Sequence, residues 1–456
     1  SISNTSIRAT AEGPIKKGQS SWLISGRTSY MNQLDWFNND KLIRWGLDVD
    51  RAKSGLDTQQ NINANLVTPL ESDAYYFDLH GKFYFESKNG SRNIASIYFG
   101  GDRTSHIADR LTRNNSLEDR FSNVEVETEN RWNNFAFSGQ HQRSISPSVY
   151  SSTMLGLSAY ETYFSKDDFL YTNISRLGES LQTTVFTYPL SNRSTMNRGK
   201  IDQTFDIFTE VLDFKTGFTG IYHRGEYNEQ SFDRQQFYTK VSALQADLFF
   251  QTDFSLLNIL NFQTGVRSHY YSEGNYFRLS PRLKLVLFED RDVSFSTGYS
   301  KNHQFINRVG FSNAVTADVW ILANDHQPPS SSNQFSTGLY LKPSAHFYFQ
   351  VEGYLKDYQN LRLHELNARS LTDTFTSSPW FYQSDGTGKG LEALFKGQLG
   401  FISLAQSYTL SSIKLQNESI NQGEEFYASW DRTHMSTTNL EINVLSNLRL
   451  FASYIM

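Results

Sequence analysis

Apolar side chains recur at every second position over long stretches of this 456-residue chain. From Tyr75 to Phe85 the odd positions are apolar or glycine, whereas the even positions include His80, Lys82 and, one step further, Glu86. Because successive side chains of a β-strand point to opposite faces, this pattern predicts strands with one apolar and one polar face. The same alternation returns around residues 260–270, 277–287, 293–300 and 347–356, and no segment shows a convincing helical period.

The lengths of the predicted strands and of their connections narrow the fold class. A soluble β-sandwich also alternates, but these strands run over about 10–15 residues, which is enough to cross a bilayer at a tilt. Short turns, such as the one around Asn89 and Gly90, alternate along the chain with long polar connections. The long loops are predicted at 33–72, 102–120, 167–199, 303–333, 358–387 and 415–430, with shorter connections near 228–236 and 272–276 on the same side.

This sorting of turns and loops is typical of outer-membrane barrels. We therefore predict an all-β fold, a transmembrane antiparallel β-barrel with about eighteen strands, in which residues 1–456 form one domain. The apolar face of each strand would contact lipid, and the polar face would line a water-filled lumen. No uncharged apolar run reaches 18 residues, so no transmembrane helix is predicted. The polar start after Ser1 lacks a signal peptide, so the chain is cytosolic, already processed, or a fragment.

Composition excludes several classes of function. The net charge is −5, with lysine and arginine scattered, so no nucleic-acid partner is expected. The chain has no cysteine, which excludes disulfides, thiolate metal sites and a cysteine nucleophile. The ten histidines share no metal-ligand spacing, and we predict neither a metal nor a cofactor. The glycine run at Gly386, Gly388 and Gly390 lacks the ending of a P-loop and reads as a loop entering a strand.

Four stretches, in chain order, resemble the barrel of TonB-dependent outer-membrane receptors of the Bacteroidetes type. They are EGPIKKGQSSWLISGRTSY from Glu12, DVWILANDHQPPSSSNQFSTGLYL from Asp318, GTGKGLEALFKGQLGFISLAQSYTLS from Gly386 and WDRTH from Trp430. Leu322 stands where that family usually has a proline, which is a mild departure. Each motif has modest specificity, but the ordered set spans nearly the whole chain.

The resemblance implies a 22-stranded barrel filled by an N-terminal plug that contacts TonB. Neither the plug nor the last strands are recognised in this sequence, so we expect the chain to be the barrel portion of a longer protein. The implied partners are the lipid bilayer, the protein's own plug, TonB, and a surface lipoprotein or another subunit of an outer-membrane complex. The implied location is the cell outer membrane.

Candidate site residues come from the long loops, where aromatic rings beside polar side chains would suit a flat ligand or a carbohydrate. The predicted ligand contacts are Trp320, Trp380, Phe381, Tyr382, Tyr427 and Trp430. The alternative is that these rings anchor at the membrane interface or pack loop against loop. Charges of the lumen parity are expected to pair with one another or with a plug: Lys82, Glu86, Arg267, Arg282, Lys284, Glu352 and Glu392.

Three functions are compatible with such a barrel. The first is active nutrient uptake: a TonB-dependent receptor that imports a scarce ligand through a plugged barrel. The second is a structural or accessory barrel subunit of a larger outer-membrane secretion or assembly complex, and the third is an open diffusion pore. Enzyme activity is not predicted, because loop pairs such as Asp325 and His326 occur in any long polar loop.

Overall fold

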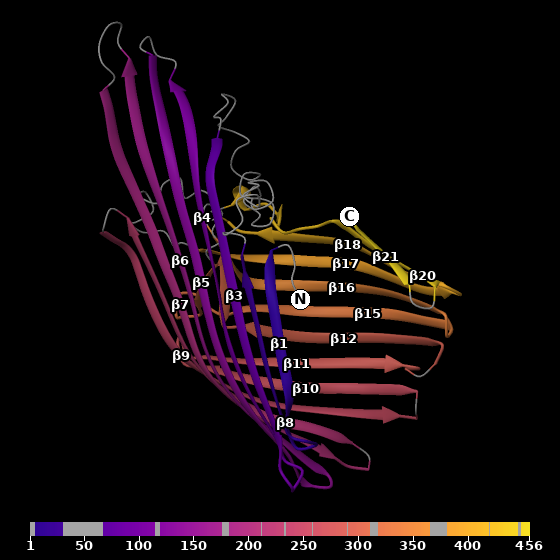
Figure 1. Cartoon of the computed structure of the whole chain (residues 1–456). Coiled ribbons are helices and arrows are strands. Elements are labelled where there is room, and N and C mark those ends of the chain that lie inside the picture. The colour runs from indigo at the N-terminus through magenta and orange to yellow at the C-terminus, as the bar shows by residue number, and fades with distance from the viewer. Residues whose placement is uncertain are drawn as a thin grey trace.

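The computed structural model describes most of the chain and consists almost entirely of β-strands (Figure 1). The described residues are 5–30, 67–114, 119–175, 182–210, 212–231, 234–257, 259–289, 291–310, 318–364, 381–418, 420–445 and 448–456. The strands are β1 (Ser6–Lys16), β2 (Ser20–Ser29), β3 (Val67–Glu86), β4 (Arg92–Asn114), β5 (Asp119–Ser146), β6 (Val149–Ser175), β7 (Gln182–Phe208), β8 (Asp213–Ser231), β9 (Arg234–Leu256), β10 (Leu260–Tyr271), β11 (Tyr276–Leu287), β12 (Val293–Gln304), β13 (Ile306–Gly310), β14 (Asp318–Leu322), β15 (Ser330–Ser344), β16 (Phe347–His364), β17 (Phe381–Leu399), β18 (Ile402–Gln416), β19 (Phe426–Tyr427), β20 (His434–Leu445) and β21 (Leu448–Ile455).

The long strands form one strongly curved antiparallel sheet in which each strand pairs with the next along the chain. Two short pieces stand outside this order: the β13–β14 hairpin is a separate two-stranded sheet, and β19 adds two residues to β18. The remaining eighteen strands make the barrel wall, which confirms the predicted strand number and fold class. Among the described residues, no hydrogen-bonded ladder joins β21 to β1.

The two faces of the wall differ in polarity, as the alternation predicts. Large apolar side chains such as Phe277, Leu279 and Leu283 stand exposed on the outer face. The opposite parity of the same region carries polar groups, including Ser280, which hydrogen-bonds to His269 of the neighbouring strand. The outer face of β10 and β11 is therefore apolar and the inner face polar, as a barrel in lipid requires.

Short turns collect at one rim, at the bottom and right of Figure 1, and the strand ends that border the longer connections lie at the other, the long-loop rim. The predicted loops at 102–120 and 167–199 were wrong, because β4 to β7 continue as strands through most of these segments and rise at the upper left of Figure 1. Beyond the lipid both faces of a strand meet water, so the chain there can remain a ladder without alternating. The short connections near 228–236 and 272–276 are confirmed.

The glycine run of β17 lies within the strand and does not form the predicted loop. Tyr354 of β16 lies across Gly390, where an added Cβ would come within 2.6 Å of the tyrosine ring. This close approach explains why glycine suits the position. The described residues include one helical turn, η3 (Asn421–Gly423), and no helix among them combines the length and the apolar character needed to span a membrane.

Candidate functional site

The β13–β14 hairpin, which we call the inner hairpin, lies against the inner face of the wall. β14 contacts β7 and β8, and β13 contacts β16. Leu322, at the end of β14, is 2% exposed. An added Cβ at Gly225 of β8 would lie 3.5 Å from Leu322 Cδ1 and 3.1 Å from Met196 Cε, so the hairpin packs tightly on this part of the wall. The inner hairpin therefore covers the inward-facing side of β7 and β8.

Aromatic stacking holds the base of the inner hairpin. Phe305, just before β13, stacks on Tyr271 of β10 with ring centroids 4.8 Å apart. Both are buried together with Ala243 and Ala323 in a small apolar cluster. The Tyr271 hydroxyl also donates a hydrogen bond to the carbonyl of Ala323 over 3.1 Å. Tyr271 thereby holds the chain at both ends of the hairpin, at Phe305 before β13 and at Ala323 after β14.

A half-buried arginine fixes the chain after β14. The guanidinium of Arg362, on β16, donates to the carbonyls of Leu322 (3.3 Å), Gln327 (2.8 Å) and Pro328 (3.3 Å). Three carbonyl acceptors suit the fixed fork of a guanidinium, so Arg362 connects the hairpin segment to the opposite side of the wall.

A chain of polar side chains runs under Phe305 across four strands. Asp247 (β9) accepts from His269 (β10) over 2.9 Å, and the other ring nitrogen of His269 lies 3.0 Å from Ser280 Oγ (β11). Ser280 Oγ lies 3.0 Å from His303 Nδ1 (β12) as well. The order acid, imidazole, hydroxyl resembles a catalytic relay. The hydroxyl is already shared with a second imidazole, however, and the chain serves to tie the wall together.

The predicted loop contacts fall in different places. Trp320 is half-buried on the inner hairpin and meets Tyr160 of β6 edge-on at 6.2 Å. Tyr427 (61% exposed) and Trp430 (48% exposed) lie beside β18 instead, with the Lys414 ammonium 5.7 Å above the Tyr427 ring. Trp380 lies outside the described residues, and Phe381 and Tyr382 begin β17. Trp320 is thus on a different sector of the wall from Tyr427.

Hydrogen bonds nevertheless connect three of the predicted long loops at the outer rim. Gln383, at the start of β17, donates to the carbonyl of His326 over 3.2 Å. Its own carbonyl accepts from Asn417 over 2.6 Å. The chain following β14, the start of β17 and the end of β18 therefore form one continuous surface. Asp325 and His326 are strongly exposed on it, with a separation of 4.0 Å, and form no enclosed catalytic pair.

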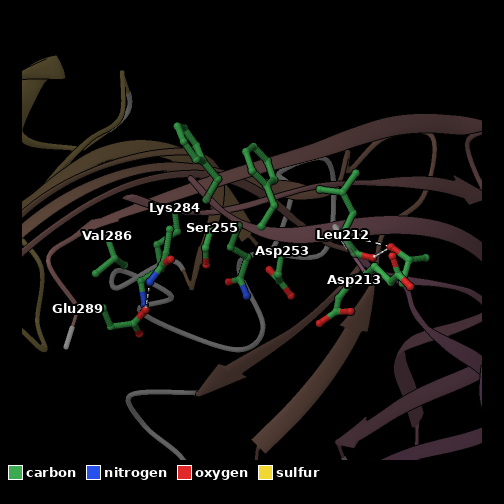
Figure 2. Close-up of a pocket in the computed structure, with 13 residues that line it drawn as sticks. Leu212, Asp213, Asp253, Ser255, Lys284, Val286 and Glu289 are labelled. Carbon is green, nitrogen blue, oxygen red and sulfur yellow. Dashed lines mark hydrogen bonds between the residues drawn. The ribbon is translucent and has the colours of Figure 1, made fainter. Parts of the chain in front are cut away.

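At the opposite rim, below the inner hairpin, an open cavity of about 520 Å³ lies between β8 and β11 (Figure 2). Among the charged groups of its lining, carboxylates outnumber the one ammonium, that of Lys284: they belong to Glu210, Asp213, Asp253 and Glu289. Asn261 donates a hydrogen bond to Glu289. The described residues contain no group of three or more histidine, aspartate or glutamate side chains that could hold a metal ion. The cavity is thus an acidic, water-accessible recess.

Contacts are seen for three of the predicted lumen charges, Arg267, Glu352 and Glu86. Arg267 reaches Asp247 at 3.5 Å, and Glu352 accepts a hydrogen bond from Tyr340. Glu86 accepts from Tyr84 over 2.6 Å. Glu86 also lies 3.9 Å from Arg92 of β4, so Arg267 and Glu86 each pair with an opposite charge of the adjacent strand, in agreement with the expectation that lumen charges pair with one another.

Sequence reasoning missed the inner hairpin, Phe305 and Arg362. A signal was present, because the predicted loop 303–333 contains the apolar run Trp320 to Ala323. A fully solvated loop has no need of such a run, and it could have indicated an inward-folded segment.

Comparison with solved structures identifies the fold. The siderophore receptor PiuA from Acinetobacter baumannii matches with a TM-score of 0.59 and 9% identity, over 99% of this chain and 69% of that one. PirA from the same organism matches with a TM-score of 0.50 and 10% identity, over 99% and 67%. The RagAB peptide importer reaches a TM-score of 0.47 at 9% identity, covering 97% and 72%. No protein-family model matches the sequence, and no curated protein does.

Proposed function

We propose that the chain forms the membrane-spanning part of a TonB-dependent receptor, which imports a scarce ligand across the outer membrane. It has the fold of an outer-membrane receptor barrel and spans about two thirds of the two Acinetobacter receptors. The observation that carries this proposal is the eighteen-strand wall whose whole length aligns with siderophore-receptor barrels. Its chemistry is binding and gating, without covalent catalysis.

The inner face supports a plug as partner. Polar groups line the wall along the strands, and the acidic recess at the short-turn rim remains open to water. In the proposed receptor, the protein's own plug would meet this lower part of the wall, and TonB would pull on the plug from the short-turn side. A surface lipoprotein would cover the opposite rim.

The test is deletion of the gene, with uptake measured in the mutant and in a strain lacking TonB. Siderophores are the first ligands to try, because PiuA and PirA, the two receptors of similar fold described above, are siderophore receptors. We expect loss of uptake of one nutrient in both strains. Unchanged uptake in both would refute the proposal. Stoichiometric partners without ligand-dependent transport would indicate an accessory subunit instead, and conductance through the isolated full-length protein would indicate an open pore.

Within this proposal, the ligand contacts are the loop aromatics Trp320, Trp380, Phe381, Tyr382, Tyr427 and Trp430. Tyr427 and Trp430 give the cleanest test, since both rings are exposed. Replacing either with alanine should weaken ligand binding about tenfold, the equivalent of ~1.4 kcal/mol of lost ring contact. Tyr222→Ala, on the outer face of β8, is the matched control. Equal affinity in all three variants would remove these rings from the site.

A further inference from the structure

Three oxygen atoms on the inner face of β7 and β8 are buried and have no hydrogen-bond partner among the described residues. They are Asn192 Oδ1, Ser194 Oγ and Glu229 Oε1. Their residues are 6%, 0% and 2% exposed, respectively. Buried polar atoms are almost always satisfied, so three neighbouring exceptions call for a bound species.

The strand register places these atoms together. Asn192 stands directly opposite Glu229, and Ser194 stands opposite Tyr227, two positions further along the same face. Directly opposed residues have Cβ atoms about 4.5–5.5 Å apart. The Tyr227 hydroxyl donates to the second carboxylate oxygen, Glu229 Oε2, over 2.7 Å. Tyr227 thereby orients the carboxylate and leaves Oε1 for another contact.

The residues that flank these atoms on the neighbouring strand are buried as well. On the β6 side, Phe164 is paired with Asn192 and Thr162 with Ser194, and both are nearly fully buried. β14 of the inner hairpin lies over β7 and β8. A ligand at this position must be the size of one or a few atoms, because an organic group would displace buried side chains.

The electrostatics call for a positive species. A carboxylate, an amide oxygen and a hydroxyl oxygen can all accept or coordinate, and within the described residues Glu229 forms no ion pair with a lysine or arginine. An ionised carboxylate at such depth is costly unless a cation lies beside it.

We propose that Asn192, Ser194 and Glu229 bind a small monovalent cation, Na⁺ or K⁺, beneath the inner hairpin. A single carboxylate with two neutral oxygens balances one positive charge. Ca²⁺ sites use more oxygen ligands and commonly several carboxylates, and Mg²⁺ retains water that this space excludes. The site is independent of the proposed import role, since it concerns how the wall and the hairpin are held.

The experiment measures the thermal unfolding midpoint of the purified protein in NaCl, KCl or N-methyl-D-glucamine chloride at equal ionic strength. The bulky organic cation cannot enter the site and controls for screening. We expect the midpoint to rise saturably, by about 2–4 °C, in NaCl or KCl. Glu229→Gln should abolish the rise, and Ser194→Ala should move it to higher salt concentration. Glu226→Gln, three residues away and less buried, is the control and should keep it.

Three results would overturn the proposal. The first is an equal midpoint in all three salts for the unaltered protein. The second is a rise that Glu229→Gln retains, which would mean that the carboxyl is protonated or hydrated. The third is stabilisation by CaCl₂ with none by NaCl or KCl, which would assign a divalent site instead. Unchanged uptake in the deletion experiment would refute the import role, but it would not alter the conclusion drawn from any of these three results.

Discussion

The inner face of the wall contrasts in its two halves. Towards the long-loop rim, β7 to β10 carry buried side chains such as His223, Asp247 and Tyr271, because the inner hairpin and neighbouring loops cover them. Towards the short-turn rim, Asp253 and Lys284 line an open recess (Figure 2). One polar face thus meets two environments, packed protein above and water below.

This difference indicates which half of the inner face contributes more to the free energy of unfolding. In the covered half, the buried polar groups have lost water, so removing a hydrogen-bond partner from one of them is costly. In the open half, water replaces any partner that is lost, and exposed ion pairs contribute little. Substitutions should therefore have effects that fall steeply from the hairpin side to the recess.

The largest effect is expected for Phe305→Ala. Removing this ring leaves a cavity against Tyr271, and about 3 kcal/mol of the docking free energy of the inner hairpin should be lost. Amide hydrogen exchange within 306–310 and 318–322 should accelerate by about a hundredfold, since each 1.4 kcal/mol is a factor of ten. Phe277→Ala, on the exposed outer face, is the control. Unchanged exchange in the Phe305 variant would mean that the hairpin is held elsewhere.

Arg362→Met should follow, with a loss of about 2 kcal/mol. The methionine fills part of the space of the side chain but leaves the carbonyls of Leu322 and Gln327 without their donor. Exchange at residues 323–327 should rise by more than tenfold. The exposed Arg449→Met should not change it. If both variants behaved alike, Arg362 would not be the link between β16 and the hairpin segment.

His269→Asn tests the hydrogen-bonded chain beneath Phe305. Asp247 would lose its 2.9 Å partner while remaining 4% exposed, although Arg267 stays within 3.5 Å. We expect a loss of about 1–2 kcal/mol in the free energy of unfolding, measured by denaturant titration. His346→Asn, at an exposed turn, should change it by less than about 0.5 kcal/mol.

The same contrast explains what the sequence could predict. Outer residues such as Phe277 and Leu279 alternate because lipid demands an apolar side chain at every second position, and strand number and facing followed from them. Above the lipid that demand ends, so the extensions of β4 to β7 were mistaken for loops. The inner hairpin was missed because its contacts with Tyr271 and Arg362 join positions far apart in the chain, and no local pattern encodes such a pairing.

The smallest effect is expected in the recess, for Lys284→Gln and Glu289→Gln. Both side chains are exposed, so water takes over their contacts, and each variant should shift the free energy of unfolding by less than about 0.5 kcal/mol. Denaturant titration of each variant beside His269→Asn measures the contrast directly. A loss above about 2 kcal/mol at Lys284 would show that the lower wall is as tightly packed as the upper one. If either substitution lowers the free energy of unfolding more strongly in a protein that contains a plug, the additional loss measures how much the contact between the plug and this recess contributes to stability.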